Sequence, residues 1–443
     1  MKIALINPKG ALFSRNAALA QAMANSETMR SFRYFWSAPN LGLLTIASYI
    51  PPSWSVTYID ENYRGLDFNE WYDLVLLSAM TVQVTRAYEI AAHYRQKGSL
   101  TVLGGIHATV LPEEALQHVD VVIAGEGEEL FPQFLKDLQN GDVKPLYRSS
   151  HKGTFSLLQC KIPRYELIQG YPYPLVNLYT TRGCPHSCSF CCASNVYGRN
   201  YRQKAIPQII TEIQTIQRVY PDTLLLFADD NAFVLRKQAK ELLRQLKGRG
   251  LRWIAQTDIS AAEDEELLTL MRQAGCQWVV IGFESIQANS LRRLNATSYK
   301  ARNVSSYPEK IQAIQSHGIG IYGTFIVGLD EDDLSVFSQT VDFILQNRLY
   351  GANITVPTPL PRTQLRQQLQ AENRIRSNTW EDYTLWDVVI EPKKMSAVEL
   401  ERGLISIYRA LMDPQNAAAR LAALLHTVRK ERHNDTKRNL SNC

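Results

Sequence analysis

The sequence has no apolar run long enough to cross a membrane. None of its hydrophobic stretches approaches the roughly 18 consecutive apolar residues that a transmembrane helix needs. Hydrophobic residues make up 45% of the chain and charged residues 21%, a balance typical of a globular protein rather than a disordered one. No signal peptide opens the sequence. We therefore expect a cytoplasmic protein without a transmembrane segment.

Cysteine is scarce, and it is unevenly spread. Three of the seven cysteines are isolated, namely Cys160, Cys276 and Cys443. The other four fall within the nine residues from Cys184 to Cys192. A structural zinc site usually takes two separated cysteine pairs, and the sequence has no second pair. Disulfide bonds are typical of secreted chains, which this sequence does not resemble. The local concentration of thiols therefore indicates a bound cofactor.

The segment from Cys184 to Cys191 reads Cys-Pro-His-Ser-Cys-Ser-Phe-Cys. Three thiolates on one loop can bind an iron-sulfur cluster and leave one iron without a protein ligand. Their spacing resembles that of the radical S-adenosylmethionine (SAM) enzymes. The resemblance implies that Cys184, Cys188 and Cys191 bind a [4Fe-4S] cluster, that SAM chelates the open iron, and that Phe190 packs beside the adenine. Cys192 has no place in the pattern.

Short apolar strands alternate with helical segments over residues 1–140. The predicted strands are 2–7, 55–59, 74–78, 100–103 and 119–124, and the clearest predicted helix is Val84–Gln96. This alternation predicts a doubly wound parallel sheet of the flavodoxin or Rossmann type. Ligands of such sheets bind at the carboxyl ends of the strands.

Three turns after these strands together resemble the cobalamin-binding domain that precedes many radical SAM cores. They are Ser78-Ala79-Met80-Thr81, Gly104-Gly105-Ile106-His107 and Gly125-Glu126-Gly127-Glu128. The resemblance implies cobalamin contacts at Ser78, Met80, Gly104, Gly105, Gly125 and Glu126.

The turn after the first strand departs from relatives that ligate cobalt with a histidine. Those relatives carry Asp-x-His-x-x-Gly, whereas this turn reads Asn7-Pro8-Lys9-Gly10-Ala11. We therefore expect cobalamin to bind with its base detached and with no histidine on cobalt. A degenerate domain that binds no cobalamin is the alternative.

A second strand-helix alternation follows residues 141–173, which are rich in glycine and proline and are predicted to connect two domains. The predicted strands are 175–181, 223–228, 253–257, 278–283, 319–327 and 352–356, and the predicted helices are 206–219, 236–247, 264–274, 307–317 and 334–346. Six such repeats resemble the partial (β/α)6, TIM-like barrel of the radical SAM core, here residues 174–363. A barrel of this kind has its active site at the carboxyl ends of its strands.

Polar residues follow the predicted barrel strands. The resemblance implies SAM contacts at Asp229, Asp230, Asn231, Gln256, Asp258, Glu284 and Ser285. Taken singly, Asp230 and Ser285 are equally well explained as caps of the helices that follow. No catalytic nucleophile, acid or base can be named.

Residues 364–443 are predicted to form a helical extension that ends in a basic tail. Residues 364–426 have mainly the pattern of amphipathic helix. This region contains Trp380-Glu381-Asp382-Tyr383 and then Pro392-Lys393-Lys394-Met395-Ser396, an order that resembles the extension of cobalamin-type radical SAM proteins that include hopanoid methylases. The aromatic residues Trp380, Tyr383 and Trp386 indicate core packing, with a wall of the substrate pocket as the alternative. The tail, from Arg429 to Arg438, is typical of a solvated end, and contact with nucleic acid or anionic lipid is less usual.

The resemblance implies a cobalamin-dependent radical SAM C-methyltransferase that acts on an unactivated carbon of a small molecule, and the aromatic residues of the C-terminal region favour an apolar one. Its cofactors would be a [4Fe-4S] cluster, SAM and cobalamin, and its electron donor would be of the flavodoxin or ferredoxin type. No nucleic acid partner is expected. Two alternatives stay open: a radical SAM cyclase, dehydratase or rearrangement enzyme, and a noncatalytic cobalamin sensor or carrier.

Overall fold

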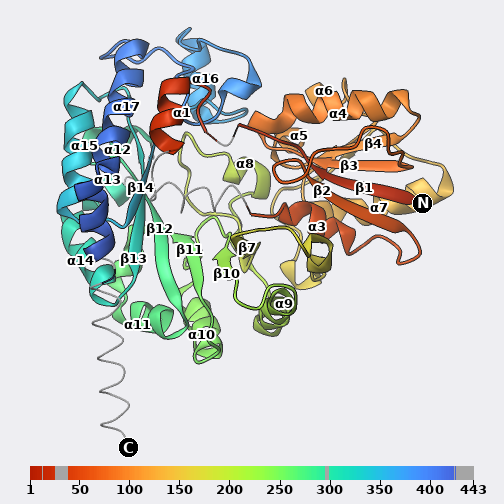
Figure 1. The fold of residues 1–443 in the computed structure, drawn as a ribbon, viewed down its shortest axis with the longest axis horizontal. Helices are drawn as coiled ribbons and strands as arrows, with labels where there is room; N and C mark the ends of the chain where they lie inside the picture. Colours follow the sequence, from red (N-terminus) through yellow and green to blue (C-terminus); the bar gives the residue numbers. More distant parts are fainter. Residues whose placement is uncertain (12, 25–37, 295–298, 424, 426–443) are drawn as a thin grey trace, which may run out of the picture.

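The computed structural model describes residues 1–11, 13–24, 38–294, 299–423 and 425. The basic tail and Cys443 lie outside these residues. Two α/β units lie side by side, and each is built on a parallel sheet of six strands (Figure 1). Within the described ranges, no helix combines the length and hydropathy that crossing a bilayer requires.

The first sheet has the strand order β2-β1-β3-β4-β5-β6. Its strands are β1 (Lys2–Asn7), β2 (Ser55–Asp60), β3 (Leu74–Ser78), β4 (Leu100–Gly104), β5 (Val121–Ala124) and β6 (Leu146–Arg148). In β1, Ile3 and Leu5 face one hydrophobic core, whereas Ala4 and Ile6 face another. Both faces are buried, which is why the strand is a continuous apolar run.

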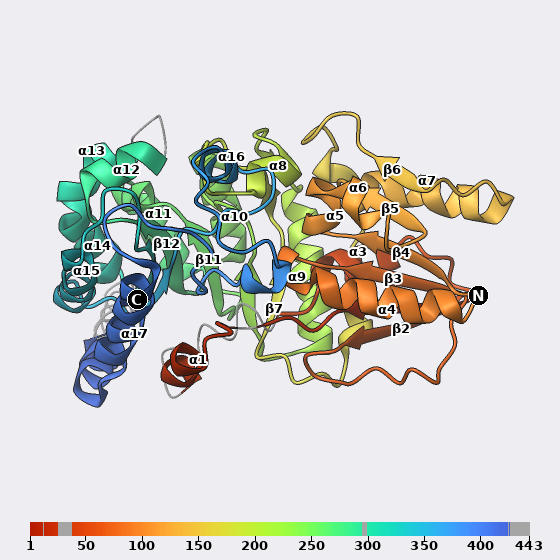
Figure 2. The ribbon, with the colours of Figure 1, turned by 90° about the horizontal axis from the view of Figure 1, so that it is seen from above.

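Helices cover both faces of this sheet (Figures 1 and 2). They are α3 (Leu41–Ala47), α4 (Val84–Gln96), α5 (Ile106–Val110), α6 (Pro112–Ala115) and α7 (Gly127–Asn140). The prediction for Val84–Gln96 is confirmed to the residue. Residues 141–173, predicted as a connection, also contain β6, which pairs with β5 and completes the sheet. A three-residue strand is too short to give a periodic pattern, so the sequence did not show it.

The second sheet has the order β14-β13-β12-β11-β10-β7 and forms an open barrel. Its strands are β7 (Leu175–Leu178), β10 (Leu224–Phe227), β11 (Trp253–Thr257), β12 (Cys276–Glu284), β13 (Gly320–Ile326) and β14 (Gly351–Thr355). All six predicted strands are present. A small antiparallel pair, β8 (Thr181–Arg182) and β9 (Arg202–Gln203), lies beside them.

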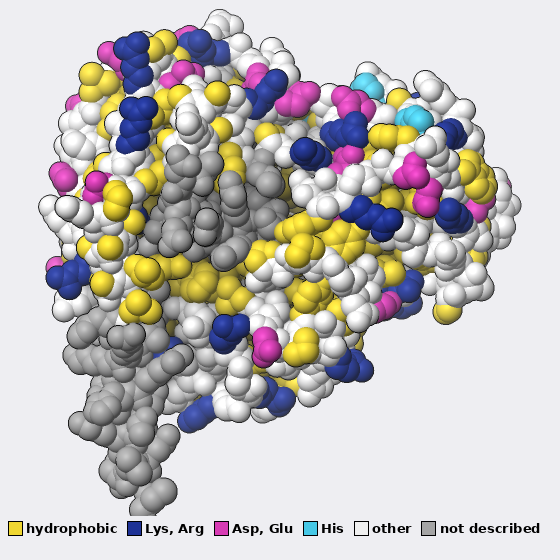
Figure 3. All heavy atoms as spheres, in the orientation of Figure 1, with side chains coloured by type: hydrophobic (Ala, Val, Ile, Leu, Met, Phe, Trp, Pro, Cys, Tyr) yellow, Lys and Arg dark blue, Asp and Glu magenta, His cyan; other side chains and the backbone are white. Residues whose placement is uncertain are grey.

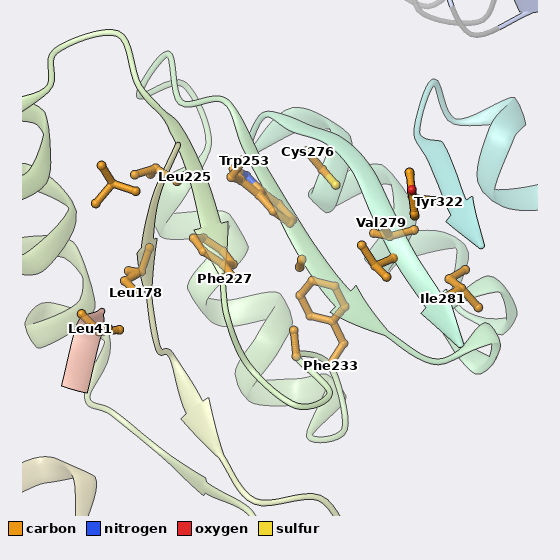
Figure 4. Packing of buried hydrophobic residues seen from close by; sticks show 14 of the residues in the cluster. Leu41, Leu178, Leu225, Phe227, Phe233, Trp253, Cys276, Val279, Ile281 and Tyr322 are labelled. Atoms are coloured by element: carbon orange, nitrogen blue, oxygen red, sulfur yellow. The ribbon is translucent and has the colours of Figure 1, made fainter. Parts of the chain in front are cut away.

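Most of the helices of this unit pack on the outside of the barrel (Figure 1). They are α9 (Ile206–Val219), α10 (Arg236–Leu246), α11 (Glu265–Gln273), α12 (Ala288–Leu294), α13 (Tyr299–Asn303), α14 (Tyr307–Ser316) and α15 (Ser335–Gln346), while α8 (Ala193–Tyr197) follows the cysteine loop. Figure 4 shows Phe227 and Trp253 among the side chains of this core, and their rings stack with centroids 4.8 Å apart. Phe227 ends β10 and Trp253 begins β11, so this contact joins the two neighbouring strands in the core.

The C-terminal region is less helical than predicted. Its helices are α16 (Gln364–Ala371), α17 (Ala397–Met412) and a further helical segment at residues 414–423, while α1 (Ala17–Ala24) packs against α17. Residues 372–396 contain only a short 3-10 turn, Trp380–Asp382, and one bridge between Ile375 and Ile390. The prediction of mainly helix is wrong for residues 372–396. Asn373 and Leu385 have φ angles of 54° and 79°, in the left-handed region, so a right-handed helix cannot continue through them.

The aromatic residues of this irregular stretch pack against other parts of the chain. Tyr383 and Trp386 are each 2% exposed, and Trp386 Nε1 donates a hydrogen bond to the Tyr408 hydroxyl. Trp380 Nε1 donates to Glu114 in the first unit over 2.9 Å. The core-packing interpretation is therefore confirmed, and Trp380 also ties the C-terminal region to the first sheet.

Candidate active site

One cavity opens between the two sheets, where strands of both sheets end. Its volume is about 440 Å³, and it is lined by residues that follow β3, β4 and β5 of the first sheet and by residues of β7, β10 and β11 of the second. Hydrophobic side chains gather between the two halves on the face shown in Figure 3. Parallel sheets bind ligands at this edge, so the cavity is the candidate active site.

All the residues that the sequence assigned to cobalamin line this cavity. They are Ser78, Met80, Gly104, Gly105, Gly125 and Glu126. The wall at Gly104 is bare backbone: a Cβ there would have only one neighbour within 4 Å, the Ile123 carbonyl at 3.8 Å. Gly105 has a φ of 91°, and a Cβ there would come within 2.9 Å of the Ala79 nitrogen. The backbone is therefore exposed at these glycines, which lets a broad ligand such as a corrin ring approach it closely.

The turn that replaces the cobalt-ligating motif is fixed by Gln83. The Gln83 Nε2 group donates to the Pro8 carbonyl over 2.7 Å. Asn40, which the sequence analysis missed, caps α3 and donates to Asn7 Oδ1 over 3.1 Å. Its position before Leu-Gly-Leu-Leu was the available signal of a helix N-cap. No histidine is among the described residues that line the cavity.

The cysteine loop is held at both sides by backbone hydrogen bonds. The Ser189 N–H donates to the Leu294 carbonyl over 2.8 Å, and the Ser189 carbonyl accepts from the Leu365 N–H over 2.9 Å. Phe190 packs against Leu294, Ile326 and Leu329. Ile326 ends β13, the fifth strand of the barrel in chain order.

The cysteine thiols are reduced and partly shielded from solvent. None of the described cysteines forms a disulfide bond. Burial raises the pKa of Cys184 to about 11 and also raises the pKa of Cys191. A cationic iron centre would offset this cost and favour the thiolates. No three His, Cys, Asp or Glu side chains of the described residues surround a single-ion position. Three thiolates that bind different irons of one cluster need no such common point, so the donor set fits the cluster.

The two acidic residues after β10, Asp229 and Asp230, have different surroundings. Asp229 is fully buried, and its Oδ1 accepts from the Thr180 and Thr181 N–H groups over 2.7 and 2.8 Å. Burial raises the pKa of Asp229 to about 6 in spite of these hydrogen bonds. Asp230 is half-buried, and burial also raises its pKa against a backbone hydrogen bond from Gly183. A SAM contact of either carboxylate stays a prediction.

Asn231 and Asp258 form one polar unit beside the cysteine loop. Asn231 Nδ2 donates to Asp258 Oδ2 over 2.6 Å, and His186 Nε2 lies 3.5 Å from the same oxygen. Burial raises the pKa of Asp258, but hydrogen bonds from His186, Ser260 and Asn231 outweigh it, so the pKa lies below its ordinary value. The carboxylate is therefore ionised at neutral pH. Gln256, on β11, lines the cavity.

Glu284 pairs with a lysine that the sequence analysis missed. Lys300 Nζ lies 2.7 Å from Glu284 Oε1. Glu284 has a φ of 64°, a strained conformation for this residue, at an irregularity in the pairing of β12 with β13. Burial lowers the pKa of Lys300, but the negative charges of Glu284 and Cys188 raise it by more. The net pKa lies above the ordinary value, so Lys300 keeps its proton at neutral pH. Ser285 Oγ accepts from the Gln287 N–H, a local turn contact, so its SAM role stays a prediction.

Buried ion pairs join the two units beside the cavity. Arg182 donates to Glu126 over 3.1 Å and to Glu128 over 2.5 Å, and Arg202 donates to the other oxygen of Glu126 over 2.6 Å. Burial opposes the charge on Glu128, but Arg182 holds the pKa of its carboxyl below the ordinary value. The sequence analysis assigned Glu126 to cobalamin, and its carboxylate is engaged by two arginines. Arg182, Arg202 and Glu128 were missed, because nothing local marks a pair across more than 50 residues.

Comparison with protein families matches both units. Residues 37–135 match the B12 binding domain, and residues 178–344 match the radical SAM superfamily. The chain belongs to the radical SAM enzymes that carry a B12-binding domain. The matched ranges cover the glycine wall of the cavity in the first unit and, in the second, the cysteine loop and the polar strand ends.

Individual relatives of this radical SAM chain support the same assignment. It is 29% identical to the bacteriochlorophyllide d C-12(1)-methyltransferase of Chlorobaculum tepidum over 379 residues, 83% of this chain and 81% of that protein. It is 29% identical to the hopanoid C-2 methylase of Rhodopseudomonas palustris over 350 residues, 76% of this chain and 65% of the relative. The radical SAM methyltransferase TsrM from Kitasatospora setae has the same fold, with a TM-score of 0.64 and 15% identity over 94% of this chain and 89% of TsrM.

Proposed function

We propose that this chain is a cobalamin-dependent radical SAM methyltransferase that acts on an unactivated carbon of a small, apolar molecule. The observation that carries the proposal is the shared cavity: glycine backbone of the B12-binding unit forms one wall, and residues of the radical SAM barrel form the other. A methyl donor held on the first wall and a radical generated at the second would reach the same substrate. The similarity to two methyltransferases supports this reaction type.

When bound, the three cofactors supply electron transfer to SAM, a 5′-deoxyadenosyl radical and a methyl group for transfer. The residues of the chain bind and orient them. Cys184, Cys188 and Cys191 would hold the cluster. The Asn231 and Asp258 unit and the Glu284 and Lys300 pair present polar groups of both charges beside it, which suits the ammonium and carboxylate of SAM.

The chain's apolar packing would protect the radical. Leu226 and Ala228 of the barrel line the cavity together with Val196, and none of these three side chains carries an O–H, N–H or S–H group. Apolar walls that exclude water favour a radical that must react only with its intended partner. We also propose a reducing, cytoplasmic location and an electron donor of the flavodoxin or ferredoxin type, supported by the oxygen-sensitive cluster that the three cysteines would bind.

Anaerobic reconstitution with iron, sulfide and hydroxocobalamin tests the proposal. After unbound cofactor is removed, we expect the ultraviolet-visible spectrum to contain cluster absorption and cobalamin in equimolar amount with the protein. A cluster without cobalamin would instead favour a one-SAM cyclase, dehydratase or rearrangement enzyme. Cobalamin without a cluster able to cleave SAM would favour a sensor or carrier.

A further inference from the structure

We propose that the buried ion pairs between the two units fix the position of the cobalamin site relative to the cluster site. Glu126, Glu128, Arg182 and Arg202 are called the interdomain ion network below. The inference rests on the proposed function, because it gives these residues a positioning role for two of its cofactors. It assigns the glutamates after Gly125 to the contact between the units rather than to cobalamin itself.

The network is shielded from solvent and geometrically demanding. The side chains of Arg182 and Glu126 are 8% and 4% exposed, and those of Glu128 and Arg202 are 5% and 12% exposed. Each oxygen of Glu126 accepts from a different arginine, and Arg182 uses two nitrogens for two glutamates. The rings of Tyr179 and Tyr197 lie 5.1 and 5.6 Å from the Arg182 guanidinium. Hydrogen bonds in this arrangement tolerate little displacement of either unit, because a planar guanidinium donates in fixed directions.

Each end of the network is joined by a short stretch of backbone to a predicted cofactor site. Glu126 follows Gly125 and precedes the first turn of α7, on the wall assigned to cobalamin. Only Gly183 separates Arg182 from Cys184. Gly183 has a φ of 89°, and a Cβ there would overlap the Asn200 backbone, so this connection is tightly packed. A shift of Glu126 would therefore move Cys184 through a rigid path.

A role in stability alone would not require the network to cross between the units. Buried ion pairs are costly to desolvate and often contribute little net stability compared with apolar packing, although they can specify one arrangement. The barrel itself offers a comparison, since Lys204 and Glu212 pair over 2.5 Å at similar burial. That pair lies within one unit. It is the matched control for the network, because removing one charge there leaves the contact between the units intact.

The test compares Glu126→Gln with Glu212→Gln in the reconstituted protein. Cob(II)alamin and the reduced cluster are both paramagnetic, and their dipolar coupling measures the distance between them. We expect Glu126→Gln to retain both cofactors and to broaden the distance distribution about twofold, because a neutral amide cannot hold both arginines. Glu212→Gln should leave the wild-type distribution. An unchanged distribution in Glu126→Gln, or equal broadening in both variants, would overturn the inference.

A second measurement uses the cofactor-free chain and separates the inference from the proposed function. We expect hydrogen exchange of the amides in residues 183–192 to become about tenfold faster in Glu126→Gln and to stay unchanged in Glu212→Gln. Arg182→Lys should give an intermediate rate, because it keeps the charge and loses the planar guanidinium. If the wild type binds no cobalamin or no cluster, the proposed function fails, while these exchange rates still test the coupling. Equal rates in wild type and Glu126→Gln would refute it.

Discussion

The two edges that face the cavity use different parts of the chain. The first sheet leaves backbone exposed at Gly104 and Gly105, beside apolar side chains such as Leu77 and Met80. The second unit contributes Asn177, Arg182 and Gln256 to the cavity lining. The charged groups of Asp258, Glu284 and Lys300 follow or lie beside its strand ends, outside that lining. We therefore expect the ligand at the first sheet to be selected by its shape and the ligand at the second sheet to be selected by its charge. This difference matches a broad ligand rich in amides on one side and a small zwitterion on the other.

The largest effect is expected at the cysteine loop, because its cysteines would bind the cluster directly. We expect Cys191→Ser to abolish the [4Fe-4S] cluster and all cleavage of SAM, because a serine hydroxyl is a poor ligand for this iron. Iron and sulfide analysis after anaerobic reconstitution measures the loss. Cys192→Ser is the control, since the adjacent residue has no place in the ligand pattern. A full cluster in Cys191→Ser, or no cluster in Cys192→Ser, would contradict this assignment of the cluster ligands.

Asp229 tests whether every carboxylate at the charged edge serves a ligand. Its folded pKa of about 6 lies above the ordinary value of 3.8, so its contribution to stability is fully present below about pH 4 and is lost as the pH rises through about 6. Asp229→Asn keeps the acceptor for Thr180 and Thr181 and cannot titrate. We expect the variant to gain on the wild type by at most about 3 kcal/mol between pH 4 and pH 7.

Urea unfolding of the cofactor-free protein at several pH values measures this difference. A difference between variant and wild type that does not depend on pH would mean that folding leaves the pKa of Asp229 unchanged. SAM binding to the reconstituted variant tests the predicted SAM contact: weaker binding would support it, and wild-type affinity would place Asp229 outside the SAM site.

The glycine wall offers a matched pair of substitutions. Gly105→Ala should destabilise the cofactor-free protein by about 2 kcal/mol, because φ is 91° and the new Cβ meets the Ala79 backbone. Gly104→Ala should leave that stability unchanged, since its Cβ would make only an ordinary contact with the Ile123 carbonyl at 3.8 Å, and should weaken cobalamin binding about tenfold. Unfolding curves and equilibrium dialysis of cobalamin distinguish the two. Unaltered cobalamin affinity in Gly104→Ala would contradict selection by shape.

The smallest effect is expected for one polar partner at the charged edge. Asp258→Asn would place an amide against the Asn231 amide and remove the negative charge beside His186. We expect SAM to bind the reconstituted protein about tenfold more weakly, with an unchanged cluster content. Isothermal titration under anaerobic conditions measures the affinity. Wild-type affinity would place Asp258 outside the SAM site.

The sequence predicted the parts of this molecule that depend on local pattern. The helix Val84–Gln96 and the barrel strand Trp253–Thr257 follow from periodic burial, and their bounds are as predicted. The wall of the cavity was also predictable, because Gly104 and Gly105 directly follow an apolar strand. Strand β6 was not, because three residues after a proline carry no period.

The side-chain partners could not be predicted from local pattern. Arg182 pairs with Glu126 across 56 residues, and Lys300, on α13, pairs with Glu284 at the end of β12. Which carboxylate pairs with which cation depends on how separate segments of the chain pack together. The same reason explains Asp229: its neighbours in sequence suggest a ligand, and its buried contacts with Thr180 and Thr181 appear only in the fold.

In the proposed reaction, a methyl group bound at the first sheet and a radical formed at the second sheet reach the same cavity. The direct test is a single turnover of the reconstituted protein with SAM and titanium(III) citrate, in which S-adenosylhomocysteine and 5′-deoxyadenosine are counted. The proposed methyltransferase should form S-adenosylhomocysteine in an amount equimolar with its bound cobalamin. 5′-Deoxyadenosine without any S-adenosylhomocysteine would contradict it and indicate a radical enzyme that consumes SAM in one way only.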